Sequence, residues 1–170
     1  VVTSGEVSVA PGLTAVINST LESDVGLTKM GEGKLVINTA VGDVTVAEGT
    51  LEASMVTGSL HVQAGATVAP GNSNGALNVN DATFEYDSML PIEVGGLKAG
   101  TQHDQVISSD IVALLGRTLV NRFVNGFTAP ELVATETIST ITSREVVGSF
   151  DPLTHQQHDL EDGLLVDVLY

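Results

Sequence analysis

The densest group of side chains that could bind a metal lies near the C-terminus, in the segment His155-Gln-Gln-His158-Asp159-Leu-Glu161-Asp162. Its imidazoles and carboxylates could bind a divalent cation, and histidines three residues apart share a face if the segment is helical. A polar loop before the last strand explains the same residues without a metal. The calcium-binding patterns of EF-hand loops and β-rolls are absent from the sequence. We therefore expect neither a metal nor another cofactor.

Enzymes that cleave acidic polysaccharides need cations to hold the substrate carboxylates and a base to remove a proton. In the second half of the chain Arg117, Arg122 and Arg144 are the candidates. A net charge of -15, from six Lys and Arg against 21 Asp and Glu, would repel such a substrate. Paired carboxylates could hydrolyse a neutral glycoside, but an acidic surface produces such pairs routinely. Gly71-Asn-Ser-Asn-Gly75 fits the letters G-x-S-x-G, but the turn signals Pro70-Gly71 and Asn74-Gly75 place it in a turn between two strands, and not in the strand-to-helix elbow that exposes a serine nucleophile. We expect a protein that is not an enzyme.

The amino-acid composition disfavours several classes of partner and favours one kind of β-sheet. The acidic charge disfavours nucleic acid and anionic lipid surfaces as partners. No apolar run approaches the roughly 20 residues of a membrane-spanning helix, so no membrane insertion is expected. The absence of cysteine excludes a disulfide framework. With 18 Gly but only four Phe and two Tyr, the chain suits narrow, repetitive sheets of small β-branched residues.

Glycines punctuate the first half of the chain at regular intervals, and short segments of alternating aliphatic residues lie between them. If these segments are extended, alternate side chains point inward. The candidates for the inner face are Leu35, Ile37, Val44, Val46, Leu51, Ala53, Leu60, Val62, Val68, Leu77 and Val79. The first members of successive segments lie 9, 7, 9, 8 and 9 residues apart, which indicates an internal repeat.

A strand of about five residues with a short turn gives this spacing, and two or three such units make one coil. Coils stacked at about 4.8 Å would let each strand pair with the strand one turn away. We therefore predict an all-β fold, a parallel β-helix forming one domain over residues 1–170. It is most regular over 26–94 and looser over 95–170. An antiparallel β-sandwich, which also has short strands and frequent turns, stays open as the alternative.

Two segments resemble the signatures of autotransporter passenger domains with autotransporter-associated β-strand repeats. Gly26-Leu-Thr-Lys-Met-Gly-Glu-Gly-Lys-Leu35 is similar to "GLTKxGxGxL", and Val68-Ala-Pro-Gly-Asn-Ser-Asn-Gly-Ala-Leu77 to "VAPGNSxGxL". The segments 148–150 and 162–170 resemble the closing rungs of those passengers. The resemblance implies a right-handed parallel β-helix that is exported and displayed outside a bacterial cell. Such passengers act as adhesins, scaffolds or, less often, enzymes.

A stack of coils has two open ends whose backbone groups must be capped or paired with another chain. Both ends of this sequence are apolar and strand-like, so we expect copies to associate end to end. The candidate residues are Val1, Val2, Leu164, Val166, Val168 and Tyr170. The expected function is a non-catalytic extracellular building block of a surface stalk or filament. The alternatives are an adhesin module that binds glycan or a cell surface and, third, a carbohydrate-active enzyme. The start at Val1, without a leader, fits export after removal of a signal peptide.

Overall fold

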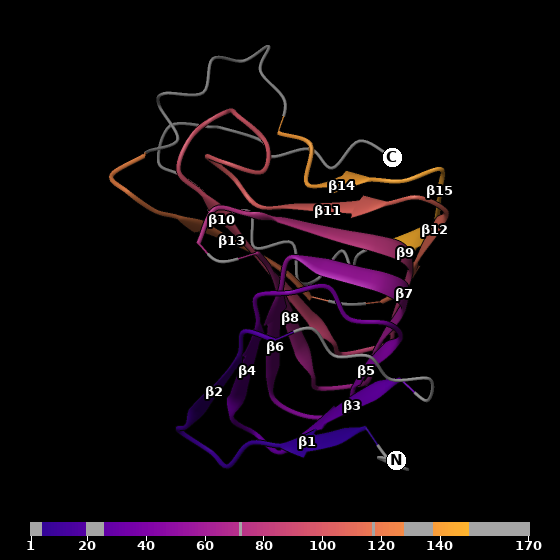
Figure 1. Ribbon diagram of the computed structural model, residues 1–170. Coiled ribbons are helices and arrows are strands. Elements are labelled where there is room, and N and C mark those ends of the chain that lie inside the picture. Colours follow the sequence, from indigo (N-terminus) through magenta and orange to yellow (C-terminus); the bar gives the residue numbers. More distant parts are fainter. Residues whose placement is uncertain (1–4, 20–25, 72, 117, 128–137, 150–170) are drawn as a thin grey trace.

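The computed structural model describes residues 5–19, 26–71, 73–116, 118–127 and 138–149 (Figure 1). These residues form strands and no helix, arranged in two sheets. Sheet A contains β1 (Glu6–Ser8), β3 (Leu27–Met30), β5 (Val44–Val46), β7 (Met55–Val62), β9 (Ala76–Phe84), β11 (Gln105–Ser108), β12 (Ile111–Leu115), β14 (Ile141–Thr142) and β15 (Glu145–Ser149). Sheet B contains β2 (Thr14–Ile17), β4 (Lys34–Ile37), β6 (Thr50–Ala53), β8 (Thr67–Pro70), β10 (Met89–Val94) and β13 (Thr118–Phe123).

The strands alternate between the two sheets from β1 to β10. Sheet A has the order β1-β3-β5-β7-β9-β11-β14, and sheet B has the order β2-β4-β6-β8-β10-β13. All pairs of these strands are parallel, which is consistent with a β-helix-like solenoid. The antiparallel β-sandwich is therefore wrong for the described residues. Their antiparallel pairing is confined to one isolated bridge, between Val94 and His103.

The pairing register explains the spacing of the repeat. Lys34 pairs with Thr50 and Thr50 with Thr67, so one layer of the stack takes 16 or 17 residues. Each layer therefore consumes two of the predicted units of eight or nine residues. The separation grows to 22 residues between Thr67 and Met89, because the intervening strand β9 is nine residues long. It grows to 29 residues between Met89 and Thr118, because the 95–104 connection and two strands, β11 and β12, lie between them.

The core lies between the sheets and contains every residue that alternation predicts to point inward. The ladder of Leu35, Leu51 and Val68 in sheet B is completely buried, and the ladder of Val44 and Leu60 in sheet A is almost so. Burying one such aliphatic side chain stabilises the fold by about 1.5–3 kcal/mol. Stacked like residues thus supply the main cohesion between layers.

Strand β9 is longer than the sequence pattern suggests, because it pairs with two strands at once. Its first half, Ala76–Val79, pairs with β11, and its second half, Ala82–Phe84, pairs with β12. The spacing predicts strands of about five residues, but β9 runs nine residues from Ala76 to Phe84. Gly58 lies inside the similarly long β7, at a register shift between Val56 and Ser59.

A substitution at Gly49, which lies at a corner, tests how tightly the layers stack. Gly49 has φ +66°, and a Cβ there would lie 2.5 Å from the carbonyl oxygen of Gly31 and 2.6 Å from that of Gly33. Gly65 has φ +78° but nothing near such a Cβ. We expect Gly65→Ala to lower the free energy of unfolding by about 1 kcal/mol through backbone strain alone, and Gly49→Ala by about 2–4 kcal/mol. Urea unfolding measures both, and equal losses would show that the layers do not pack this closely.

Candidate functional site

Several residues singled out in the sequence lie outside the described residues. They are the proposed association residues Val1, Val2, Leu164, Val166, Val168 and Tyr170, the cluster His155–Asp162, and Arg117. Among the residues that the structure does describe, no group of three or more His, Asp or Glu side chains could hold a metal ion. The described part also has no helix that could cross a lipid bilayer. Other polar groups therefore define the candidate sites.

The two described arginines of the candidate set do not come together. The Arg122 guanidinium in β13 of sheet B lies 3.8 Å from the Glu93 carboxylate. The Arg144 guanidinium, just before β15 of sheet A, lies 3.9 Å from the Asp110 carboxylate. Each arginine thus faces an acidic side chain of the protein itself, and the two do not form a joint binding site for substrate carboxylates.

Acidic side chains at the corners accept hydrogen bonds from backbone N–H groups of an adjacent layer. The Glu48 carboxylate accepts from the Gly31 N–H at 2.9 Å, and the Asp43 carboxylate accepts from the Ser59 N–H at 2.9 Å. The Glu85 carboxylate accepts from the Ala64 N–H at 3.2 Å and lies 2.7 Å from His61 Nε2. These carboxylates occupy backbone donors that the turns leave open. They join layers and do not converge on one point where a substrate could react.

Lys29 is completely buried, in the inner row of sheet A beside Val46. Its ammonium donates to three backbone carbonyls, those of Met30 at 2.9 Å, Gly31 at 2.6 Å and Glu48 at 2.9 Å. Burial lowers the pKa of Lys29, and the charge of Glu48 opposes that shift. The ammonium therefore caps two neighbouring corners from inside the stack. Alternation with Leu27 already indicates an inward position for Lys29, although a lysine is not expected there.

A second buried polar group lies where the longer connections begin. The Asp104 carboxylate accepts from the Gly75 N–H at 2.7 Å and from the Glu93 N–H at 2.8 Å. Burial raises the pKa of Asp104, and these two hydrogen bonds oppose the shift. Neighbouring His103 is buried with Nδ1 3.1 Å from the Gly96 carbonyl oxygen, while its Nε2 lacks a hydrogen-bond partner. The two hydrogen bonds of Asp104 hold the 95–104 connection against the turn before β9 and against β10.

The outer face of sheet B carries three rows of side chains that run across the strands, and we call it the striped face. Pairing in register places aliphatic residues in the central row, with Glu52 among them. The central row is Val16, Val36, Glu52, Ala69, Pro91 and Val120; one flanking row is Thr14, Lys34, Thr50, Thr67 and Met89; the other is Asn18, Asn38, Ser54, Gly71, Glu93 and Arg122. The striped face is thus apolar along its middle and polar along both sides.

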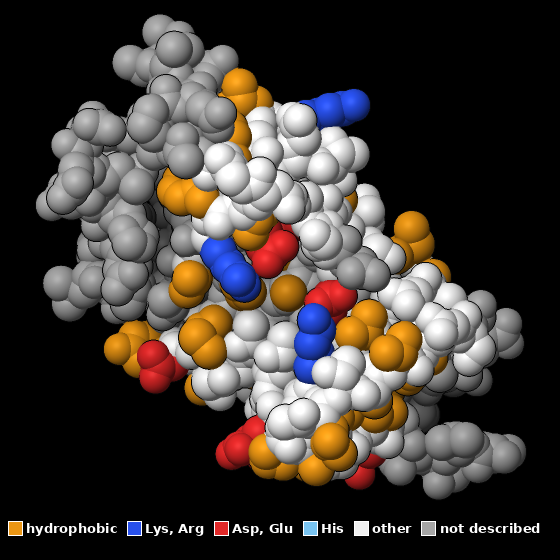
Figure 2. All heavy atoms as spheres, turned by 90° about the vertical axis from the view of Figure 1, so that its left-hand side faces the viewer, with side chains coloured by type: hydrophobic (Ala, Val, Ile, Leu, Met, Phe, Trp, Pro, Cys, Tyr) orange, Lys and Arg blue, Asp and Glu red, His pale blue; other side chains and the backbone are white. Residues whose placement is uncertain are grey.

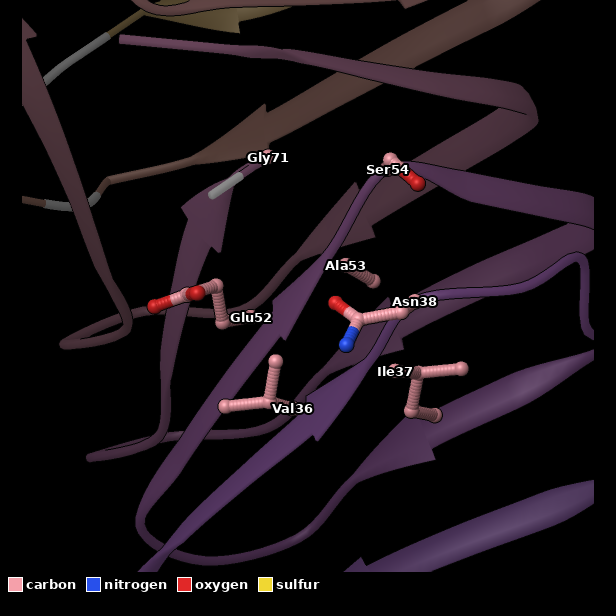
Figure 3. Close-up of a pocket in the computed structure, with 7 residues that line it drawn as sticks. All are labelled: Val36, Ile37, Asn38, Glu52, Ala53, Ser54 and Gly71. Carbon is pink, nitrogen blue, oxygen red and sulfur yellow. The ribbon is translucent and has the colours of Figure 1, made fainter. Parts of the chain in front are cut away.

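The striped face carries two ion pairs. Lys34 pairs with Glu52, and Arg122 with Glu93. Figure 2 shows acidic and basic side chains together in a hollow between apolar groups on this side of the molecule. Val36 and Glu52 are each only 8% exposed although both point outward, away from Ile37 and Ala53 (Figure 3).

A pocket of about 70 Å³ opens near the ends of β4 and β6. Figure 3 shows the residues that line it, which include outward Val36 and Glu52 together with Asn38 and Ser54 at the strand ends. Its walls thus combine an aliphatic side chain with an amide, a hydroxyl and a carboxylate. Such a lining can make both apolar contacts and hydrogen bonds to a bound group.

The N-terminal strands of both sheets end the stack within the described residues, since β1 pairs only with β3 and β2 only with β4. The carbonyls of Leu13 and Ile17 accept from the N–H groups of Lys34 and Asn38 at 2.9 and 3.0 Å. In a parallel ladder alternate residues point their backbone groups to opposite sides. The N–H and C=O of Thr14 and Val16 therefore face away from β4, and those of Glu6 and Ser8 face away from β3 in the same manner. Among the residues that the structure describes, these two strands form an open edge.

Comparison of the chain with protein-family models, with curated proteins and with solved structures gives no match.

The capping role of Lys29 predicts a large loss of stability when its ammonium is removed. Lys29→Met keeps the length of the side chain but removes three hydrogen bonds, although the Met30 carbonyl still accepts from the Val9 N–H at 3.0 Å. We expect the free energy of unfolding to fall by about 3 kcal/mol or more. The matched control is Lys98→Met, which changes an exposed lysine and should cost at most about 1 kcal/mol. Urea unfolding compares the two variants, and a loss for Lys29→Met no larger than that for Lys98→Met would refute the role.

The raised pKa of Asp104 predicts a defined pH dependence. The folded protein binds a proton at Asp104 more tightly than the unfolded chain does, whose pKa has the ordinary value of 3.8. Its favourable contribution is therefore complete below that value and is lost as the pH rises through the folded-state pKa. The stability difference between the wild type and Asp104→Asn should shrink between about pH 3 and about pH 7. Denaturant unfolding across that range measures it, and a difference that grows with pH would contradict the prediction.

Proposed function

We propose that this chain is a non-catalytic extracellular structural protein, a right-handed parallel β-helix that assembles end to end as the building block of a surface stalk or filament. The observation that carries the proposal is the open edge formed by β1 and β2. Exposed strand edges are templates for pairing with another chain, and soluble proteins usually cover or charge them. Here the N–H and C=O groups of two strands face outward together from the same end of the stack.

Side chains at this end support the same conclusion. Val7, Ala15 and Ile17 belong to the inner rows, yet they are only partly buried because no further layer covers them within the described residues. Leu13 and Val16 are 61% and 53% exposed. Another layer placed against β1 and β2 would bury this apolar surface and pair the outward backbone groups in one step.

The opposite end offers the complementary surface. In the described residues β13 pairs only with β10, β14 only with β11, and β15 only with β12. Stacking the N-terminal layer of one copy on these strands of another would continue both parallel sheets in the same direction. Such a heterologous contact does not close on itself, and it generates an open filament. The association residues predicted at the two chain ends remain predictions within this proposal.

The family resemblance supports the extracellular setting. In the first signature, Lys29 donates to the Gly31 carbonyl, and a Cβ at Gly33 would crowd the Ala10 carbonyl and Val9. These motif positions thus have physical roles in stacking layers, as expected of a repeated structural signature. Right-handedness agrees with the strong preference of parallel crossover connections for that hand. Export to the cell surface, as in autotransporter passengers, is part of the proposal.

Removing the outward backbone donors tests the assembly. The double variant Ser8→Pro/Thr14→Pro deletes one outward N–H from each edge strand, and proline is tolerated at sheet edges. The control Ser8→Ala/Thr14→Ala changes the same side chains but keeps both N–H groups. We expect the wild type and the alanine control to form concentration-dependent fibres in electron micrographs, and the proline variant to sediment as a monomer of 17.5 kDa.

Two outcomes would overturn the proposal. The first is a wild-type protein that stays monomeric at the highest attainable concentration. The second is assembly by the proline variant equal to that of the alanine control, because fibres would then not depend on the open edge. Far-ultraviolet circular dichroism of all three proteins verifies that the prolines leave the fold intact.

A further inference from the structure

The outer face of a parallel sheet is usually covered, because both faces of such sheets tend to be apolar. The striped face fits that description along its central row, where Val16 and Val36 stand in register and Ala69 follows Glu52. Val16 and Val120, at the two ends of the row, are 53% and 41% exposed. An apolar strip bordered by hydroxyl and amide groups is complementary to a ligand that has an apolar face and hydrogen-bonding groups at its sides.

The charges on the striped face indicate which net charge a ligand can carry. The striped face holds two cations and two anions, which pair with each other as Lys34 with Glu52 and Arg122 with Glu93. It therefore presents no net charge, although the chain as a whole carries -15. An anionic ligand would meet the acidic field of the remaining surface, and a cationic one would be drawn to that surface instead. The face is complementary to an uncharged ligand.

The regular spacing of side chains along each row indicates that the ligand is a polymer with a similar repeat. Equivalent side chains recur on successive strands at about 4.8 Å, and one hexose of an extended 1,4-linked chain is close to this length. A sugar chain lying across the strands would place each ring over a similar set of groups. Its C–H faces would pack on the aliphatic row, while its hydroxyls would reach Thr50 and Thr67 on one side and Asn38 and Ser54 on the other.

The pocket adds a contact for one substituent. Its volume of about 70 Å³ exceeds several times the roughly 10–15 Å³ that one water molecule needs. It is lined by the outward side chains of Val36 and Glu52 with Asn38 and Ser54 at its rim (Figure 3). A hydroxymethyl or acetamido group fits this size and these hydrogen-bonding partners.

We propose that the striped face binds an uncharged, extended hexose polymer laid across the strands of sheet B, with one sugar substituent in the pocket between β4 and β6. This inference goes beyond the structural function proposed above and does not depend on end-to-end assembly. The polymer is bound and not cleaved.

Titration with defined oligosaccharides tests the proposal. The probes are the hexasaccharides of β-1,4-linked glucose, mannose and N-acetylglucosamine, with hexagalacturonate as the acidic counterpart. Isothermal titration calorimetry, at a protein concentration where sedimentation shows monomers, should detect binding of at least one uncharged hexasaccharide. We expect the disaccharide of the same sugar to bind at least about tenfold more weakly and hexagalacturonate not to bind.

Variants locate the site. Ala69→Arg inserts a long charged side chain into the middle of the aliphatic row and should weaken binding by at least about tenfold. The matched control Thr45→Arg lies on the outer face of sheet A and should leave the affinity unchanged. If Ala69→Arg fails to fold, Val120→Arg at the exposed end of the row replaces it.

Three results would overturn the proposal. They are failure of all uncharged hexasaccharides to bind at millimolar concentration, equal binding by the sheet B variant and the sheet A control, and binding of hexagalacturonate as strong as that of the uncharged probes. Because all binding measurements use monomeric protein, their outcome does not depend on whether the protein forms fibres.

Discussion

Parallel pairing between layers is the constraint on which the rest of this structure depends. Every strand must find one neighbour in the preceding layer and one in the next, since a backbone donor or acceptor left unpaired and dry costs free energy. The apolar side chains of the inner rows also depend on the adjacent layers. Leu35 is paired with Leu51 of the next layer, and Leu51 with Val68 of the layer after it, so that each is shielded from water. Nothing inside such a stack closes it, so its length is set by its ends and not by its core.

The acidic composition follows partly from this constraint. A corner between two strands leaves N–H and C=O groups without partners, and polar side chains of the adjoining layer supply them. Glu48 accepts from Gly31, and Lys29 donates to the carbonyl of Glu48 and to that of Gly31, so two corners are bound together in both directions. Asp43 and Asp104 do the same elsewhere. Side chains that look like a solvated surface in the sequence are therefore parts of the frame.

The local sequence pattern predicts much of the fold, but it does not predict features that depend on contacts with other layers. Alternation identifies the inner rows correctly, and the glycine spacing gives units of the right length. Neither shows that β9 continues past Val79, because this depends on both β11 and β12 lying beside it.

The candidate sites were hidden for the same reason. Lys29 shares its parity with Leu27, but its burial becomes understandable only when the Glu48 carbonyl of the next layer is in place. Glu52 points outward by the alternation of β6 and yet is 8% exposed, and its carboxylate pairs with Lys34 of the preceding layer. In the sequence, a site shows itself only when reactive residues lie near one another along the chain. The stack instead assembles its surfaces from residues 16 or 17 positions apart.

The two proposals share one physical origin, which is the repeat of the layers. A row that recurs at the strand spacing can be extended by a further copy of the chain or matched by a polymer of similar period. Val16 and Val120 stand at opposite ends of the central row of the striped face, and both are exposed. In an end-to-end assembly Val120 of one copy would lie beside Val16 of the next, and the aliphatic strip would continue across the junction. Assembly would then lengthen the binding face in proportion to the number of copies, so that many weak contacts to one long sugar chain act together.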